Sequence, residues 1–310
     1  MTQQSSATRS STPVLLNRAG LMWGLLGVTA FSFTLPLTRF AIGGGMSPLF
    51  VGSGRAVVAA LLAACALTLT RQALPHGVQW VRLTVVAGGV VVGFPVLTSF
   101  ALQTAPAGHG AVVIGLLPAA TAVVAVLRTG ERPPRAFWIA AAVGAAAALA
   151  FALISGGGVL GLHWSDLLLF GSVIAAAVGY AEGGLLSRDL GAWQTVSWAL
   201  VVASPVMVLL AAAAVAFEPP SGTPSTWAAF AYLAVVSMFL GFFAWYRGLS
   251  IGPMARVSQV QLVQPVMTIA WAALLLGEAL TWQTVVGGLL VIACAAGAVI
   301  VRTTARPTTA

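Results

Sequence analysis

The sequence predicts an all-α integral membrane protein of ten transmembrane helices, arranged as two inverted five-helix repeats. Three observations support this fold class: the composition, a match between the two halves of the chain, and the distribution of arginine. Of 310 residues, 59% are hydrophobic and only 6% are charged, and the mean hydropathy is +1.00. An ordinary soluble domain has roughly 25% charged residues. A soluble fold of this size could not bury so much apolar surface.

The hydropathy pattern predicts ten spans, because a helix needs about 20 apolar residues to cross the hydrocarbon core. They cover residues 20–41, 48–70, 80–102, 106–127, 135–155, 165–187, 193–216, 226–249, 253–276 and 280–302. The segments 1–19 and 303–310 are rich in Ser, Thr and Pro, and we expect disordered cytoplasmic tails there. The first apolar segment lacks a small-residue cleavage site, so we interpret it as an uncleaved span.

The two halves, residues 20–155 and 165–302, match each other at a spacing of 147 residues. Pro118 and Gly130-Glu131 recur as Pro265 and Gly277-Glu278. Spans four and nine are therefore expected to end on the same short polar signal. Internal repeats with broken helices are typical of secondary transporters, in which the binding site forms between the repeats.

Arginine predicts the orientation of the chain. Twelve of the fourteen arginines fall on one side of the membrane if the spans alternate in direction. They are Arg9, Arg18, Arg71, Arg82, Arg128, Arg132, Arg135, Arg188, Arg247, Arg256, Arg302 and Arg306. By the positive-inside rule, this side and both termini are cytoplasmic. Because each half has an odd number of spans, the second half enters from the opposite side and the repeats are inverted. Arginines spread in this way also argue against a nucleic-acid partner.

A second match aligns Phe31-Ser32 through Arg39 in the first span with Tyr180-Ala181 through Arg188 in the sixth. With the Pro-x12-Glu ending of spans four and nine, this pattern resembles the EamA-type transporters of the drug/metabolite transporter superfamily. The resemblance covers the chain from about Leu21 to Val301. It implies a carrier of the bacterial inner (plasma) membrane, often an exporter of amino acids or related metabolites, that needs no ATP hydrolysis and no bound cofactor. The family often has Trp-Gly and Lys in its first span, whereas this chain has Phe31-Ser32 and Arg39, so the substrate stays open.

We therefore predict a secondary transporter that moves a small metabolite across the bilayer by alternating access, with export as the expected direction. The alternative is a passive channel or a membrane-embedded regulator. An enzyme is not expected, because the sequence has no clustered carboxylates and no His-rich metal set. Without Lys it has no Walker motif. Cys65 and Cys294 lie in separate spans without metal-ligand spacing, so no metal site is predicted.

Span nine carries the strongest candidates for substrate binding. Ser258, Gln261, Gln264 and Thr268 follow one helical stripe, and Pro265 removes a backbone donor beside them. The alternative is a polar stripe that only ties helices together. Further candidates are polar or aromatic residues of spans one, three, six and eight, namely Thr34, Phe94, Ser99, Tyr180, Trp245 and Tyr246. The last two fit an aromatic belt at the membrane interface equally well.

Two charged residues fall inside predicted spans. Glu182 lies about 26 Å from the outer end of span six, and it is a candidate for proton coupling. Its alternatives are an ion pair with Arg247 or Arg188, or contact with water. Arg55 lies about 12 Å from the outer face. It is a possible contact for an anionic group of the substrate, and snorkelling to the outer headgroups is the alternative.

Overall fold

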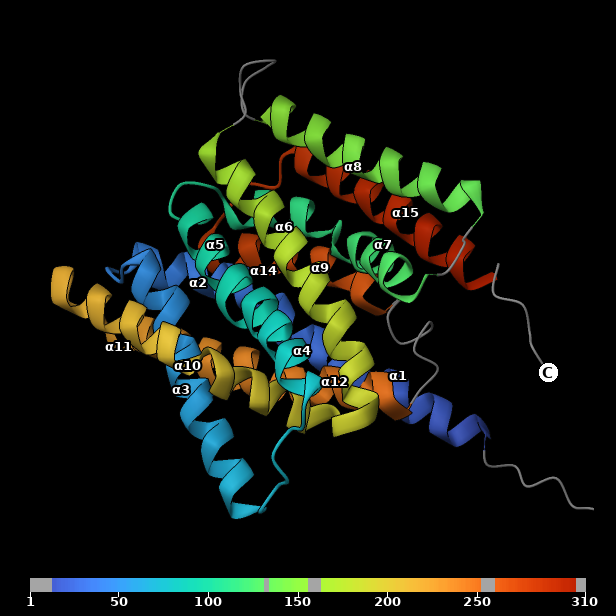
Figure 1. The fold of residues 1–310 in the computed structure, drawn as a ribbon. Coiled ribbons are helices and arrows are strands. Elements are labelled where there is room, and N and C mark those ends of the chain that lie inside the picture. Colours follow the sequence, from blue (N-terminus) through green and yellow to red (C-terminus); the bar gives the residue numbers. More distant parts are fainter. Residues whose placement is uncertain (1–12, 131–133, 156–162, 252–259, 305–310) are drawn as a thin grey trace, which may run out of the picture.

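The computed structural model describes residues 13–130, 134–155, 163–251 and 260–304 (Figure 1). In this part of the chain, eight helices are long and apolar enough to cross a membrane, and two further apolar helices are shorter. The eight are Ala19–Gly43, Pro48–Leu69, Val78–Ala101, Ala107–Thr129, Arg135–Ile154, Trp164–Leu190, Ala192–Phe217 and Pro224–Ile251. The shorter two are Val260–Leu276 and Trp282–Gly297. The all-helical membrane class is thus confirmed, whereas the count of ten spans stays a prediction.

Several spans consist of more than one helical segment. The helical segments of the first half are α1 (Pro13–Ser32), α2 (Thr34–Gly43), α3 (Pro48–Leu69), α4 (Val78–Val86), η1 (Ala87–Gly93), α5 (Phe94–Ala101), α6 (Ala107–Ile114), α7 (Leu117–Thr129) and α8 (Arg135–Ser155). Those of the second half are α9 (Trp164–Leu190), α10 (Ala192–Phe217), α11 (Pro224–Ala231), η2 (Tyr232–Leu240), α12 (Gly241–Ile251), η3 (Val260–Val263), α14 (Gln264–Leu276) and α15 (Trp282–Thr304).

The predicted tails are partly helical. Helix α1 begins at Pro13, so residues 13–19 are not the disordered segment that the composition suggested. Proline suits the first turn of a helix, where its missing N–H would have no partner in any case. Helix α15 likewise continues to Thr304. The remaining tail residues, 1–12 and 305–310, lie outside the described part.

The repeat is visible in the local structure of spans four and nine. Helices α7 and α14 are 13 residues long, and each has proline in its first turn. They end at Gly130 and Gly277, whose φ angles are 69° and 66°. This left-handed conformation suits glycine, which has no Cβ to clash. The prediction that both helices end at the Gly-Glu pair is confirmed.

Spans three and eight share a feature that the sequence did not predict. Each contains a π-helical segment, η1 in the first half and η2 in the second. The 147-residue spacing places the start of η1 inside η2. π turns interrupt α-helices rarely and are frequent at functional sites. Both segments contribute residues to the cavity described below.

The halves pack through pairs of helices. Helix α1 packs on α12, and α9 packs on η1 and α5. In the same way α3 packs on α10, α6 on α14 and α8 on α15. Figure 1 shows α8 beside α15 along one edge of the bundle. Glycines allow the closest approach, because a Cβ at Gly248 would lie 2.7 Å from the nitrogen of Gly24. A Cβ at Gly89 would lie 2.9 Å from the Cα of Gly179. Small residues at these positions let the helix backbones approach closely.

Candidate functional site

A narrow cavity lies where segments of both halves meet, and we call it the central cavity. Its walls are Phe31, Thr34, Arg55, Val90, Phe94, Pro95, Leu117, Tyr180, Ser237, Met238, Phe242 and Gln264. The volume is about 20 Å³, which is room for about one water molecule. Five of the predicted site residues are therefore brought together from five separate spans.

Neutral polar side chains of Thr34, Ser237 and Gln264 border the central cavity. The hydroxyls of Thr34 and Ser237 are 2.8 Å apart, and this hydrogen bond joins the first half to the second. The side chain of Gln264 is 7% exposed, and its Oε1 has no hydrogen-bond partner among the described residues. A buried acceptor without a partner is costly, so this oxygen is suited to receive a donor from a bound solute.

The polar residues of span nine have two kinds of surroundings. Gln261, Gln264 and Pro265 line a second space of about 10 Å³ next to the central cavity. Thr268 lines the same space, but its hydroxyl donates to the carbonyl of Ser32 at 2.9 Å and ties α14 to α1. Thr268 thus ties two helices together, whereas substrate binding by Gln261, Gln264 and Pro265 stays a prediction. Ser258 lies outside the described part of the chain.

Arg55 is the charged residue of the central cavity. Its side chain is 1% exposed and lies in the interior. The snorkelling alternative required a side chain that reaches the surface, and this one does not. Nη1 lies 3.5 Å from Thr38 Oγ1. Nε and Nη2 have no hydrogen-bond partner among the described residues. The sequence identified this residue as a possible anion contact, and in the structure it lines the same cavity as Gln264.

Trp245, Tyr246 and Ser99, which were also predicted, line neither of these two spaces. Trp245 and Tyr246 are 2% and 0% exposed, so they belong to the apolar core and not to an aromatic belt. The reason is that α12 packs tightly on α1: a Cβ at Gly27 would lie 2.9 Å from the nitrogen of Trp245. Ser99 faces α3, since a Cβ at Gly52 would lie 3.3 Å from its Oγ.

Sequence reasoning missed Phe31 and Ser237, which both line the cavity. Phe31 contacts Phe242, another lining residue, with ring centroids 4.8 Å apart. The repeat held a usable signal, because Phe31 aligns with Tyr180 and both line the cavity. Leu117 likewise aligns with Gln264 at the 147-residue spacing.

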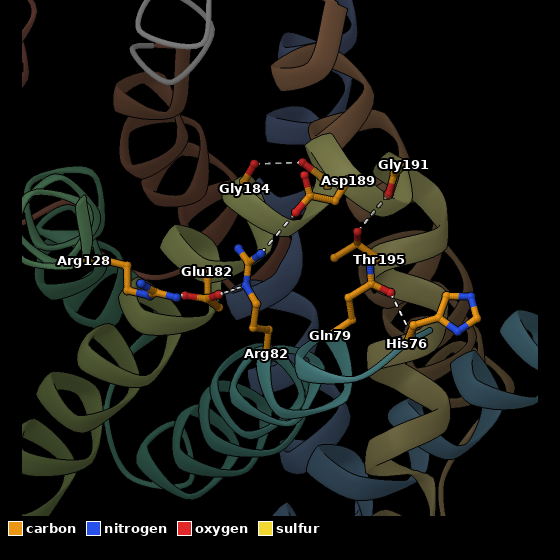
Figure 2. Close-up of polar contacts among 10 residues, drawn as sticks. His76, Gln79, Arg82, Arg128, Glu182, Gly184, Asp189, Gly191 and Thr195 are labelled. Carbon is orange, nitrogen blue, oxygen red and sulfur yellow. Dashed lines mark hydrogen bonds and ion pairs between the residues drawn. The ribbon is translucent and has the colours of Figure 1, made fainter. Parts of the chain in front are cut away.

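One end of the bundle carries an ionic cluster, which we call the Glu182 cluster (Figure 2). Glu182 forms ion pairs with Arg82 and with Arg128, the latter at 2.8 Å. Arg82 also reaches Asp189 at 3.2 Å. The cluster links α4 and α7 of the first half to α9 of the second. The sequence had suggested Arg247 or Arg188 as partners, because it could not show that α4 and α7 lie beside this part of α9.

At the other end of the bundle, Glu278 joins the two halves. Its carboxylate accepts hydrogen bonds from the backbone N–H groups of Ala107 and Gly108 at 2.7 and 2.8 Å. These groups open α6, and an acidic group stabilises a helix N-terminus. Nearby, His109 lies 2.6 Å from Asp166. We call this region the Glu278 end.

A hollow of about 420 Å³ lies at the Glu278 end. Glu278 and His109 line it, together with Ile269 and Ala272 of α14. The hollow is larger than the central cavity, but the Glu278 carboxylate that lines it already accepts hydrogen bonds from two backbone amides. By contrast, Arg55 and Gln264, whose buried polar atoms include some without a partner in the described ranges, line the central cavity. The central cavity is therefore the better candidate site.

The structure has several apolar helices long enough to cross a membrane, and a cavity with polar groups lies between two similar halves. These features define a multi-pass membrane protein built like a secondary carrier. The model of the EamA-like transporter family matches residues 18–153 and again residues 163–300. A relative from Bacillus subtilis (strain 168), uncharacterized transporter YdeK, is 44% identical over 283 residues. This alignment covers 90% of the chain and 96% of the relative.

The chain therefore belongs to the EamA-like transporter family and is a membrane transporter. This confirms the resemblance seen in the sequence. A solved crystal structure also matches, with a TM-score of 0.62 and 19% identity, over 94% of this chain and 100% of its own. At this identity the match shows that the fold is shared and nothing more.

Proposed function

We propose that the protein is a secondary transporter that moves a small metabolite, an amino acid or a related compound, by alternating access. One observation carries the proposal. Segments of both halves enclose a cavity with buried polar groups that have no partner among the described residues, and polar contacts join the halves at each end of the bundle. A carrier needs a site near the middle of the membrane that opens to one face at a time.

Helix packing supports inverted repeats. Span one packs on span eight, and span six packs on span three. Span six is the equivalent of span one in the second half, and span three is the equivalent of span eight in the first half. Spans two, four and five each pack on their own equivalents. Such reciprocal pairing is expected when a pseudo-two-fold axis relates the halves. An axis in the membrane plane follows from the odd number of spans in each half.

The two ends of the bundle are proposed as alternating closures. The Glu278 contacts join α6 to the loop after α14, and the Glu182 cluster joins α4 and α7 to α9. Breaking one set while keeping the other would open the central cavity to one side only. The arginine distribution supports a cytoplasmic Glu182 cluster, an outer Glu278 end and cytoplasmic termini in a bacterial plasma membrane.

Export is the proposed direction, because the family resemblance implies it. Proton coupling through Glu182 stays a prediction. In the structure Glu182 serves as an ion-pair partner of Arg82 and Arg128, and this supports a role in closing the bundle. The pH-gradient experiment given in the Discussion separates the two roles.

Counterflow in proteoliposomes tests the proposed function. Purified protein would be reconstituted with a high internal concentration of one amino acid, and uptake of the same labelled amino acid would be followed across a panel. A carrier should give transient, saturable accumulation, which protein-free liposomes should not show. Flux that does not saturate would favour the channel alternative, and absence of flux for every solute would favour the regulator.

A further inference from the structure

The central cavity contains a cation that no described residue neutralises. Arg55 forms no ion pair within the described part of the chain, and its guanidinium contacts Thr38 through Nη1 only. Burial of a lone ion is strongly unfavourable, and a buried charge deprived of its partner is strongly destabilising. A ligand of opposite charge would remove this cost.

The unpaired nitrogens indicate the geometry of that ligand. Nε and Nη2 of Arg55, the two atoms without partners, lie along one edge of the planar guanidinium. Their N–H groups are parallel, and two oxygens of one carboxylate can accept both. The atom of the guanidinium that has a protein contact, Nη1, lies away from this edge.

The remaining walls indicate the rest of the ligand. Arg55 is the single charged side chain among the lining residues, so one negative charge balances the cavity. A cation would be repelled, and a dianion such as phosphate would keep an unbalanced charge. Phe31, Phe94 and Phe242 offer apolar surface. Gln264 Oε1 offers an acceptor for a neutral donor such as a hydroxyl group.

On the basis of the proposed transport function, we infer that Arg55 binds the carboxylate of the transported solute. The solute is a small monocarboxylate with an apolar body and a hydrogen-bond donor. In the described arrangement the cavity has room for about one water molecule. The solute therefore enters when the halves move apart at one end.

Thermal unfolding of the purified full-length protein tests this inference. The probes are monocarboxylates, namely amino acids, 2-hydroxy acids and 3-phenylpropanoate, each compared with its primary amide. At least one carboxylate should raise the Tm, and its amide should need at least about a tenfold higher concentration. Arg55→Met should abolish this preference. Arg71→Gln, a change of an exposed arginine, should leave it intact.

The ligand-free variant provides a second measurement. Arg55→Met should raise the Tm of the protein without ligand, because it removes a buried charge that has no partner. A lower Tm would mean that Arg55 has a structural partner, and it would overturn the inference. Amides or cations that stabilise as well as carboxylates, or no stabilisation by any carboxylate, would overturn it too.

Counterflow separates this inference from the proposed function. Saturable counterflow of a neutral or cationic solute that persists in Arg55→Met would leave the transporter standing and refute the carboxylate site. A carboxylate that binds through Arg55 in wild type but shows no counterflow would refute the transport function and keep the binding site.

Discussion

Replacing Glu278 with alanine should weaken closure at one end of the bundle. Its carboxylate accepts hydrogen bonds from the amides of Ala107 and Gly108. Glu278 follows α14 of the second half, whereas these amides begin α6 of the first half. Alanine at this position would leave the first turn of α6 without its acidic partner and would remove a contact between the halves.

The magnitude follows from the two hydrogen bonds and the negative charge that alanine cannot supply. Removal of a side-chain cap costs about 0.5–2 kcal/mol, and the charge at a helix N-terminus contributes about 0.3–1 kcal/mol. Together these give about 2 kcal/mol for Glu278→Ala. Because 1.4 kcal/mol corresponds to a factor of ten, the population open at this end should rise about 30-fold.

Cysteine labelling measures this change. Ala272 lines the hollow at the Glu278 end and is 1% exposed, so Ala272→Cys should react slowly with a polar maleimide. The assay uses detergent-solubilised protein in which Cys65 and Cys294 are serine. Adding Glu278→Ala should raise the labelling rate about 30-fold if the rate follows the open population. Glu218→Gln, at an exposed acid, is the matched control. An unchanged rate with Glu278→Ala would refute the closure.

Three further predictions concern topology, binding and coupling. A single cysteine at position 132 should react from the cytoplasm and one at position 278 from outside; reaction of both from one side would refute the inverted repeats. Gln261→Ala and Gln264→Ala should each weaken solute binding several-fold, because a lost hydrogen bond costs about 0.5–1.5 kcal/mol, and unchanged affinity in the double variant would make the stripe structural. Glu182→Gln should lower stability by about 1–3 kcal/mol in thermal unfolding, since two arginines lose a charged partner. If Glu182 also carries a proton, this variant should lose transport driven by a pH gradient and keep exchange; unchanged pH-driven uptake would exclude that role.

The helix endings show how local signals succeed. Gly130 and Gly277 were expected to end their helices, and both adopt the left-handed conformation that glycine tolerates. The first helix shows the limit of such reasoning. Composition suggested that it begins at residue 20, but Pro13 is compatible with a helix start and the helix begins there. Composition alone does not distinguish a polar helical turn from a tail.

The site was partly predictable for the same reason. Polar residues inside apolar spans stand out, and Arg55, Gln261 and Gln264 were found in this way. Phe31 did not stand out, because an aromatic residue in a membrane span is ordinary until the fold shows which cavity it borders. Reading the repeat as a guide to position, rather than only as evidence of duplication, would have identified Phe31.

Residue order is enough to show that the chain crosses a membrane and is built from two similar halves. Hydrophobic composition, proline and glycine act on their own neighbourhood, and their effects can be read along the chain. The partners of the polar groups became known only from the fold. Glu182 pairs with Arg82 and Arg128 from distant helices, and Glu278 pairs with the start of α6. Arg55 has no such partner among the described residues. Whether a charge is neutralised depends on distances between helices, and hydropathy and residue spacing carry no information about those distances.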